Sequence, residues 1–251
     1  MTHHLTIITG ASRGMGLAMA EQLLDAGHDL LCIARRHNDE LGQRATRAGR
    51  RCEQWALDLG QPQAAATRLE VWLASTDVAS LASVTLINNA GVLPRIAPIA
   101  AVPALELTNA LRVGLEAPML LTSAFLRATQ GWAVPRKVLN ISSGLGRRAM
   151  ASQAAYCAAK AGMDNFTRSV ALEEAGQRNG AKVCSLAPGV IDTDMQVQMR
   201  GADAKEFPDI GTFVGLKEKG ALTSPQEAAQ RVLAFLARAD FGDNPVADVR
   251  G

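Results

Sequence analysis

Short apolar runs alternate with longer stretches of helical spacing along the whole chain. The runs are nearly continuous in apolar residues, as is typical of strands covered on both faces, and they occupy residues 5–9, 29–34, 52–57, 84–88, 137–142 and 182–186. Strands that alternate with helices in this way predict repeated βαβ units. We therefore expect a parallel sheet flanked by helices.

Two of the intervening helices have clear ends. One begins after Asn38, whose side chain can cap the first turn, and ends at Gly49. Another begins after Ser224, which is followed by a first-turn proline and a reciprocal glutamate, and runs to about Ala239. Residues 195–222 break the alternation, because they are punctuated by glycine and mixed in polarity. This segment is either a lid over a binding site or a plain excursion of the chain.

Composition limits the classes of partner. With 48% hydrophobic and 20% charged residues, the 251-residue chain can bury a large core, and we expect one domain over residues 1–251. A formal net charge of +2 provides no excess of positive charge that would attract nucleic acid or a membrane surface. A small-molecule partner is therefore expected.

Cysteine and histidine positions argue against a metal site or a disulfide framework. The four cysteines form no C-x-x-C pair, and His3 and His4, placed before the first predicted strand, have no clear carboxylate or cysteine partner. No stretch reaches the roughly 18 apolar residues that a membrane span requires, and no signal segment opens the chain. These features favour a cytoplasmic protein with reduced thiols.

A glycine-rich turn, TGASRGMG, joins the first predicted strand to the first helix. Its candidate binding residues are Gly10, Ser12, Arg13, Gly14, Met15 and Gly16. Three glycines let the backbone turn tightly and approach a pyrophosphate, while the helix N-terminus offers free N–H groups to the anion. Glycines in such turns also occur for turn geometry alone, so the position between strand and helix gives the motif its weight.

The second predicted strand ends in Ala34-Arg35-Arg36, where an NAD-binding protein normally has an acidic residue for the ribose hydroxyls. Arg35 offers a planar, permanently charged fork that suits a 2′-phosphate, and Arg13 can approach from the glycine turn. The alternative is a pair of solvated surface arginines. The missing acid and the two arginines together favour NADPH over NADH.

Ser143, Tyr156 and Lys160 form the third candidate constellation. Ser143 ends the fifth predicted strand, and the other two residues lie four apart on one face of the next helix. A free phenol titrates near pH ~10, and a cation at ~4 Å in an effective dielectric of about 20 contributes roughly 4 kcal/mol, or ~3 pKa units. Lys160 is thus expected to lower the pKa of Tyr156 and make it a proton donor, with Ser143 donating to a carbonyl oxygen. The alternative is a surface lysine beside a packing tyrosine.

Together these motifs resemble the classical short-chain dehydrogenases/reductases (SDR). Further matches are NNAG at residues 88–91, YCAAK beginning thirteen residues after Ser143, and Pro188-Gly189 with Thr193 after the sixth predicted strand. The resemblance covers nearly the whole chain. It implies an α/β, single-domain Rossmann fold, with a doubly wound parallel sheet of about seven strands flanked by helices.

The resemblance also implies roles for individual residues. Near the cofactor it places Asp58, Leu59, Asn89, Ala90, Gly91, Tyr156, Lys160, Pro188, Gly189, Ile191 and Thr193. Near the substrate it places Ser143, Leu145, Tyr156, Val190, Met195, Met199 and Asp248. The family usually has an asparagine in the helix before the fifth strand, where this chain has Gly114, so the usual proton relay is incomplete. Asn109 is no simple replacement, because five residues rotate a helical side chain by roughly 140°.

Two segments narrow the resemblance to the sepiapterin reductases and the bacterial benzil reductases. These are Ala187–Gln196 and Leu216–Gly220, and Asp248 matches a carboxylate that anchors the pterin ring in sepiapterin reductase. The expected function is NADPH-dependent reduction of a vicinal dicarbonyl. The alternatives are a reductase of another ketone class, such as 3-oxoacyl or steroid-like substrates, and an NADP-binding protein without catalysis. By resemblance, a homodimer or homotetramer is expected.

Overall fold

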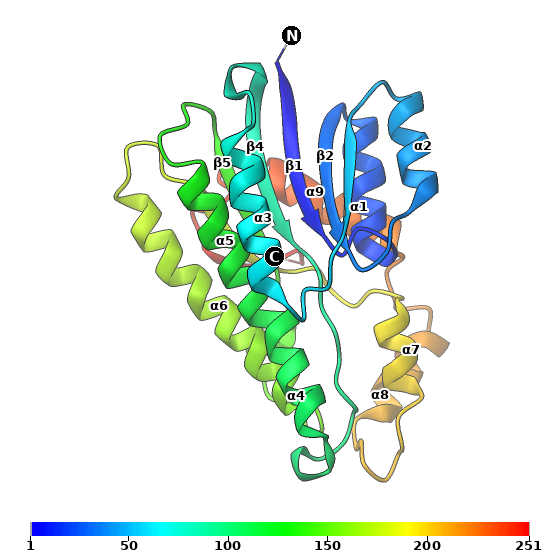
Figure 1. The fold of residues 1–251 in the computed structure, drawn as a ribbon. Helices are drawn as coiled ribbons and strands as arrows, with labels where there is room; N and C mark the ends of the chain where they lie inside the picture. Colours follow the sequence, from blue (N-terminus) through cyan, green and yellow to red (C-terminus); the bar gives the residue numbers. More distant parts are fainter. Residues whose placement is uncertain (1, 251) are drawn as a thin grey trace.

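A parallel sheet of seven strands forms the centre of the computed structural model, which describes residues 2–250 (Figure 1). The strands are β1 (His3–Thr9), β2 (His28–Ala34), β3 (Cys52–Ala56), β4 (Leu81–Asn88), β5 (Arg136–Ile141), β6 (Lys182–Ala187) and β7 (Val246–Asp248). Their order is β3-β2-β1-β4-β5-β6-β7, and adjacent strands are parallel. The predicted doubly wound α/β fold is confirmed.

Helices pack on both faces of the sheet (Figure 1). One face carries α1 (Gly14–Asp25), α2 (Asp39–Arg47) and α9 (Pro225–Ala237), and the other carries α3 (Pro62–Ala74), α5 (Ala117–Ala128) and α6 (Ala154–Ala175). Helix α4 (Ala104–Leu111) continues into α5 through a π-helical turn, η3 (Arg112–Glu116). Short 3-10 turns are η1 (Val78–Ser80), η2 (Ile99–Ala101) and η4 (Gly144–Gly146).

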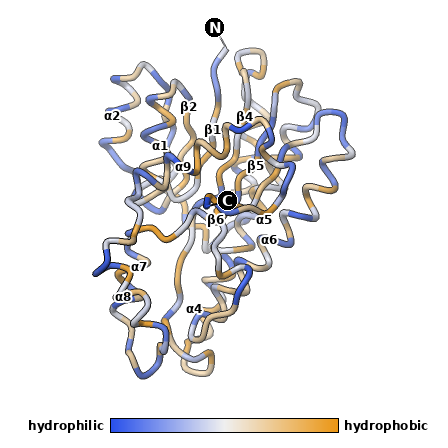
Figure 2. The backbone as a smooth tube through the Cα atoms, turned by 180° about the vertical axis from the view of Figure 1, so that it is seen from behind, coloured by the Kyte–Doolittle hydropathy of each residue, from blue (hydrophilic) through white to orange (hydrophobic). Residues whose placement is uncertain are grey.

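The strands are apolar along their length because both of their faces are covered. In β1, Ile7 points into the core beneath α3, α5 and α6, whereas Ile8 points into the core beneath α1, α2 and α9, and both are 0% exposed. The residues of the strands, inside the molecule, are mostly apolar, and those of the outer helices are more mixed in hydropathy (Figure 2). Continuous apolar runs in the sequence therefore correspond to buried parallel strands.

The predicted helix caps are confirmed. The N–H of Leu41 donates to Oδ1 of Asn38 at 2.9 Å, and the N–H of Glu227 donates to the Ser224 hydroxyl at 3.2 Å. Helix α9 ends at Ala237, two residues before the predicted end. His3 and His4 are the first residues of β1 and do not precede it, which corrects the sequence prediction.

The chain direction across the sheet reverses between β1 and β4, which are neighbours in the sheet but far apart in the sequence. In doubly wound folds a crevice forms at this point, at the carboxyl ends of the strands. Residues after β6 fold into α7 (Asp194–Arg200) and α8 (Ile210–Glu218) at the same end of the molecule (Figure 1). Among residues 2–250, no helix has the length and apolar character needed to span a membrane.

Candidate active site

The turn between β1 and α1 depends on its glycines. Gly10 and Gly14 have φ angles of +71° and +57°, in the left-handed region that L side chains rarely adopt. A Cβ on Gly16 would lie 2.2 Å from the Gly10 carbonyl oxygen and 2.5 Å from Nδ2 of Asn89. Position 16 therefore has no room for a side chain.

Asn89 and Ala90, just after β4, hold this turn in place. Their backbone N–H groups donate to the Thr9 hydroxyl at 2.9 and 3.0 Å, and the Asn89 amide donates to the Thr9 carbonyl at 2.9 Å. The first turn of α1 has no side-chain cap, so its N–H groups and positive helix end are available to an anion. Met15 is buried in the core, which leaves only its backbone for such a contact. The turn fits a dinucleotide pyrophosphate.

Arg35 and Arg36 follow β2 and are exposed. Neither guanidinium forms an ion pair or a hydrogen bond with another residue in the described range 2–250. The side-chain amide of Asn38 donates to the Ser12 carbonyl at 3.2 Å, which ties the arginine segment to the glycine turn. Two unpaired cations thus lie beside the turn, where a 2′-phosphate would need them.

Ser143, Tyr156 and Lys160 meet at the carboxyl end of β5. The Ser143 hydroxyl accepts a hydrogen bond from the Leu145 N–H at 3.2 Å, and it lies close enough to the Tyr156 phenol to influence the pKa of that phenol. One turn later on α6, the Lys160 ammonium donates to the Ile141 carbonyl at 2.7 Å and lies 5.7 Å from the centre of the Tyr156 ring. The three residues that the sequence spacing selected are neighbours in space.

The electrostatics of this group differ from the sequence prediction. The pKa of Tyr156 is raised, because desolvation opposes the phenolate more than the nearby Ser143 hydroxyl favours it. Burial lowers the pKa of Lys160 to about 8, and the Asp164 carboxylate partly offsets this effect. The predicted lowering of the Tyr156 pKa is therefore wrong for this structure, because the ammonium is itself desolvated and donates to the Ile141 carbonyl.

Asp164 is a buried carboxylate that the sequence analysis missed. Its Oδ1 accepts hydrogen bonds from the hydroxyls of Ser142 and Ser185, both at 2.6 Å. Its Oδ2 lies 3.3 Å from Nε of Arg147, the residue after η4. The carboxylate therefore ties α6 to the ends of β5 and β6. Its position four residues after Lys160 on the same helix is the sequence signal that points to it.

Gly114 lies in η3, close to α6. A Cβ on Gly114 would lie 3.1 Å from the Cβ of Ala159, so a side chain there would require one helix to shift. Asn109 faces another part of the molecule, because its Oδ1 lies 3.0 Å from the position of a Cβ on Gly60. The expectation that Asn109 and Gly114 point in different directions is confirmed.

An apolar cluster joins α7 and α8 to the residues around Tyr156. We call it the lid cluster, and its members are Leu93, Ile96, Leu145, Met150, Cys157, Met199, Ala202, Phe207, Ile210, Phe213 and Leu216. Phe207 and Phe213 are buried and stack with ring centres 5.5 Å apart. This packing brings the segment against the residues around Tyr156, and its role as a lid over a binding site stays a prediction.

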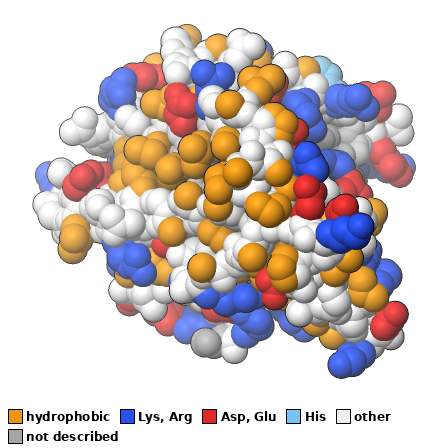
Figure 3. All heavy atoms as spheres, turned by 90° about the horizontal axis from the view of Figure 1, so that it is seen from below, with side chains coloured by type: hydrophobic (Ala, Val, Ile, Leu, Met, Phe, Trp, Pro, Cys, Tyr) orange, Lys and Arg blue, Asp and Glu red, His pale blue; other side chains and the backbone are white. Residues whose placement is uncertain are grey.

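Two ion pairs connect the segment that contains α7 and α8 to the turns after β1 and β4. Arg95, after β4, donates to both carboxylate oxygens of Glu206 at 2.9 and 2.8 Å. On the other side, Arg13 of the glycine turn pairs with Asp194, the first residue of α7. Seen from the end that carries α4, α7 and α8, the surface shows a broad gathering of apolar side chains (Figure 3).

Comparison with known proteins decides the family. The model described as short chain dehydrogenase matches residues 4–204. A benzil reductase ((S)-benzoin forming) from Bacillus cereus is 37% identical over 240 residues, covering 96% of each chain. The chain belongs to the short-chain dehydrogenase family. It is therefore an oxidoreductase that acts on CH–OH or C=O groups.

Two further family members resemble the chain over nearly its whole length. A sepiapterin reductase from Meriones unguiculatus is 32% identical over 259 residues, covering 95% of this chain and 96% of its own. A solved structure from Beutenbergia cavernae, inferred to be an NAD(P)-dependent gluconate 5-dehydrogenase and holding NADP at low occupancy, is 26% identical with a TM-score of 0.82. That match covers 99% of this chain and 96% of the solved chain.

Other residues predicted to contact the family's cofactor lie near the same edge of the sheet. Gly189 has a φ of +87°, and Ile191 forms a parallel bridge to Thr223. Thr193 precedes the first turn of α7, and Pro188 directly follows β6. Asp58 and Leu59 follow β3, and Gly91 follows Ala90. Val190, predicted to contact the substrate, accepts a hydrogen bond from the N–H of Thr223 at 3.0 Å. Leu59 is 5% exposed within the core, so only its backbone can face a nucleotide.

Asp248, predicted as a substrate contact, is the last residue of β7, and its carboxylate already pairs with an arginine. Arg250 donates to it from Nε and Nη2 at 2.8 and 2.7 Å and holds its pKa low. Nη1 of Arg147 lies 3.9 Å away. A substrate contact would therefore have to compete with Arg250.

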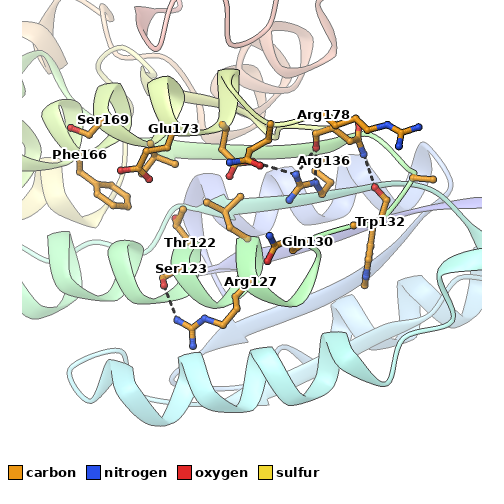
Figure 4. Close-up of a pocket in the computed structure, with 17 residues that line it drawn as sticks. Thr122, Ser123, Arg127, Gln130, Trp132, Arg136, Phe166, Ser169, Glu173 and Arg178 are labelled. Atoms are coloured by element: carbon orange, nitrogen blue, oxygen red, sulfur yellow. Dashed lines mark hydrogen bonds and ion pairs between the residues drawn. The ribbon is translucent and has the colours of Figure 1, made fainter.

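A hollow of about 1080 Å³ lies between α5 and α6, away from the candidate active site (Figure 4). It is lined by Arg127, Trp132, Arg136 and Phe166 among others. Arg136 begins β5, whereas Ser143 follows its carboxyl end. The hollow is therefore near the amino ends of the strands, whereas the candidate active site is at their carboxyl ends.

Proposed function

We propose that this oxidoreductase is a carbonyl reductase that uses NADPH to reduce a vicinal dicarbonyl of the benzil or sepiapterin type. The observation that carries the proposal is the meeting of the Ser143 hydroxyl, the Tyr156 phenol and the Lys160 ammonium beside the glycine turn and under an apolar lid. The benzil and sepiapterin reductases among its relatives support the substrate class.

The cofactor of this enzyme is NADP(H). The glycine turn fits the pyrophosphate, and Arg35 and Arg36 present unpaired guanidinium groups where NAD-specific relatives place an acid. Arg13 can add a third cation from the turn, at the expense of its pairing with Asp194. A guanidinium binds a phosphate dianion in a bidentate manner, which supports selection of the 2′-phosphate. The solved relative with bound NADP is consistent with this choice.

The bound nicotinamide supplies the hydride, and the protein supplies the proton. The Ser143 hydroxyl donates to the substrate carbonyl oxygen and fixes its position. Tyr156 then protonates that oxygen, and its raised pKa keeps the phenol in the protonated form at neutral pH. With a pKa of about 8, Lys160 is mostly cationic at pH 7 and stabilises the phenolate that proton transfer leaves behind. A ketone thereby becomes an alcohol.

The lid cluster accounts for an apolar substrate. Leu145 and Met199 belong to it, and Cys157 brings it next to Tyr156. The Cε of Met195 lies 3.4 Å from the position of a Cβ on Gly91, so α7 reaches across to the segment that follows β4. Aromatic rings flanking a pair of carbonyl groups would find apolar contacts there.

The test is NADPH oxidation by the purified protein with benzil, sepiapterin, a 3-oxoacyl thioester and a steroid ketone. We expect turnover to be highest with a dicarbonyl and to fall roughly 100-fold or more in Tyr156→Phe, since a positioned acid contributes about that much. NADPH affinity of the variant, from fluorescence titration, serves as the control and should be unchanged. Tight NADPH binding without reduction of any carbonyl would instead indicate a non-catalytic protein.

We further propose that the protein forms a homo-oligomer and is cytoplasmic. Leu111 and Met119 are 40% exposed and Leu172 is 79% exposed, on helices that flank β5. These apolar side chains support a homodimer or homotetramer formed through α4, α5 and α6. The four cysteines are free thiols, which is compatible with the proposed cytoplasmic location.

A further inference from the structure

Gln153 is a buried side chain whose polar atoms have no protein partner. It immediately precedes α6 and is 1% exposed. Neither Oε1 nor Nε2 forms a hydrogen bond with any residue in the described range 2–250. An unpaired buried amide costs free energy, so folded proteins rarely keep one that has no use.

The residues around Gln153 place it between the lid and the candidate proton donor. The preceding Ser152 has a φ of +61° and donates its hydroxyl to the carbonyl of Glu206, between α7 and α8. Cys157 belongs to the lid cluster. The Gln153 carbonyl accepts a hydrogen bond from the N–H of Cys157 at 2.9 Å, so Gln153 lies one turn before Tyr156 and Cys157 at the start of α6. A substrate held at Tyr156 is therefore within about one helical turn of Gln153.

We propose that Nε2–H of Gln153 donates a hydrogen bond to the second, non-reacting carbonyl oxygen of a vicinal dicarbonyl. The inference rests on the proposed function and names the group that recognises this substrate class. Ser143 and Tyr156 hold the reacting oxygen. The second oxygen is on the adjacent carbon, so a donor next to Tyr156 can reach it.

This arrangement makes Gln153 a specificity-determining residue. A dicarbonyl satisfies the buried amide, whereas a simple ketone of the same shape leaves it unpaired. Sites built to hydrogen-bond a substrate group discriminate against analogues that lack the group for this reason. Gln153 also gains no protein hydrogen bond on folding, so an apolar residue of equal length should not destabilise the protein.

The experiment compares benzil with deoxybenzoin, which has the same two phenyl rings but a methylene in place of one carbonyl. Gln153→Met keeps the length of the side chain, and Gln153→Leu serves as a second variant if the first folds poorly. Gln198→Leu is the matched control, because Gln198 is a lid glutamine whose Nε2 already donates to the Pro94 carbonyl at 3.3 Å. The measurements are kcat/KM for both ketones and the midpoint of urea unfolding.

In Gln153→Met we expect kcat/KM for benzil to fall roughly tenfold or more, with the value for deoxybenzoin changed less than about twofold. The unfolding midpoint should be equal to or higher than that of the wild type. Gln198→Leu should change both ketones alike.

Two results would overturn the inference, and they differ from failure of the proposed function. The first is a ratio of benzil to deoxybenzoin turnover that stays at its wild-type value in both Gln153 variants. The second is a loss of stability in these variants, as expected when a hydrogen-bonded glutamine is replaced. In either case the wild type still reduces benzil. A wild-type protein that reduces no dicarbonyl removes the proposed function, and this inference with it.

Discussion

Replacing Lys160 by methionine should abolish activity and at the same time stabilise the protein. Lys160 is 4% exposed, and burial lowers its pKa from the ordinary 10.5 to about 8. Each pKa unit corresponds to ~1.4 kcal/mol, so retaining the ammonium costs the native state ~3 kcal/mol at pH 7. The variant also loses the hydrogen bond to the Ile141 carbonyl, worth about 1 kcal/mol. We expect a net gain of about 2 kcal/mol in the free energy of unfolding.

The pH dependence separates this cause from a general packing effect. In the unfolded chain Lys160 stays protonated up to about pH 10.5, whereas in the native state it loses its proton near pH 8. Between these values the unfolded state binds more protons, so wild-type stability rises with pH and the advantage of the variant shrinks. Most of the gain should be lost by about pH 10.

Urea unfolding at pH 7 and near pH 10 provides the measurement. Lys182→Met is the control, because that lysine is 56% exposed and pairs with Asp243 at the surface. It should show no comparable gain at pH 7 and no loss of catalysis. The reasoning is refuted if Lys160→Met is no more stable than the wild type at pH 7, or if its advantage is the same at both pH values.

Gly16→Ala places a Cβ 2.2 Å from the Gly10 carbonyl oxygen and should weaken NADPH binding roughly tenfold or more by fluorescence titration, whereas Gly211→Ala meets nothing within 4 Å and should not. Burial lowers the pKa of His28 from 6.5 to about 4, so the unfolded state takes up this proton first and stability should fall as pH drops through this range. His28→Gln should flatten that part of a stability profile, and an unchanged profile would exclude His28 as the cause. Leu172→Asp puts a charge on a side chain that is 79% exposed and should reduce the mass measured by light scattering to the 26.5 kDa of one chain, and an unchanged mass would exclude this face as the interface.

The sequence by itself determined the elements whose signals are local. Six strands were evident as continuous apolar runs, because a strand covered on both faces needs apolar side chains at successive positions. The caps at Asn38 and Ser224 were evident because capping depends on residues within one turn. The grouping of Ser143, Tyr156 and Lys160 was predictable from a strand end and a helical spacing of four.

Only the tertiary structure decided the features that depend on distant segments. β7 has three residues and pairs with β6 at the edge of the sheet, and a segment this short has no periodic pattern that predicts a strand. The contacts of Asp164 come from Ser142 after β5, Ser185 in β6 and Arg147 after η4, and the spacing along α6 reveals none of them. The pKa of Tyr156 rises because desolvation depends on everything packed around the phenol, whereas the sequence shows only its charged neighbour one turn away. Local pattern thus fixes secondary structure and spacing, while burial and the electrostatics that follow from it are fixed by how the whole chain packs.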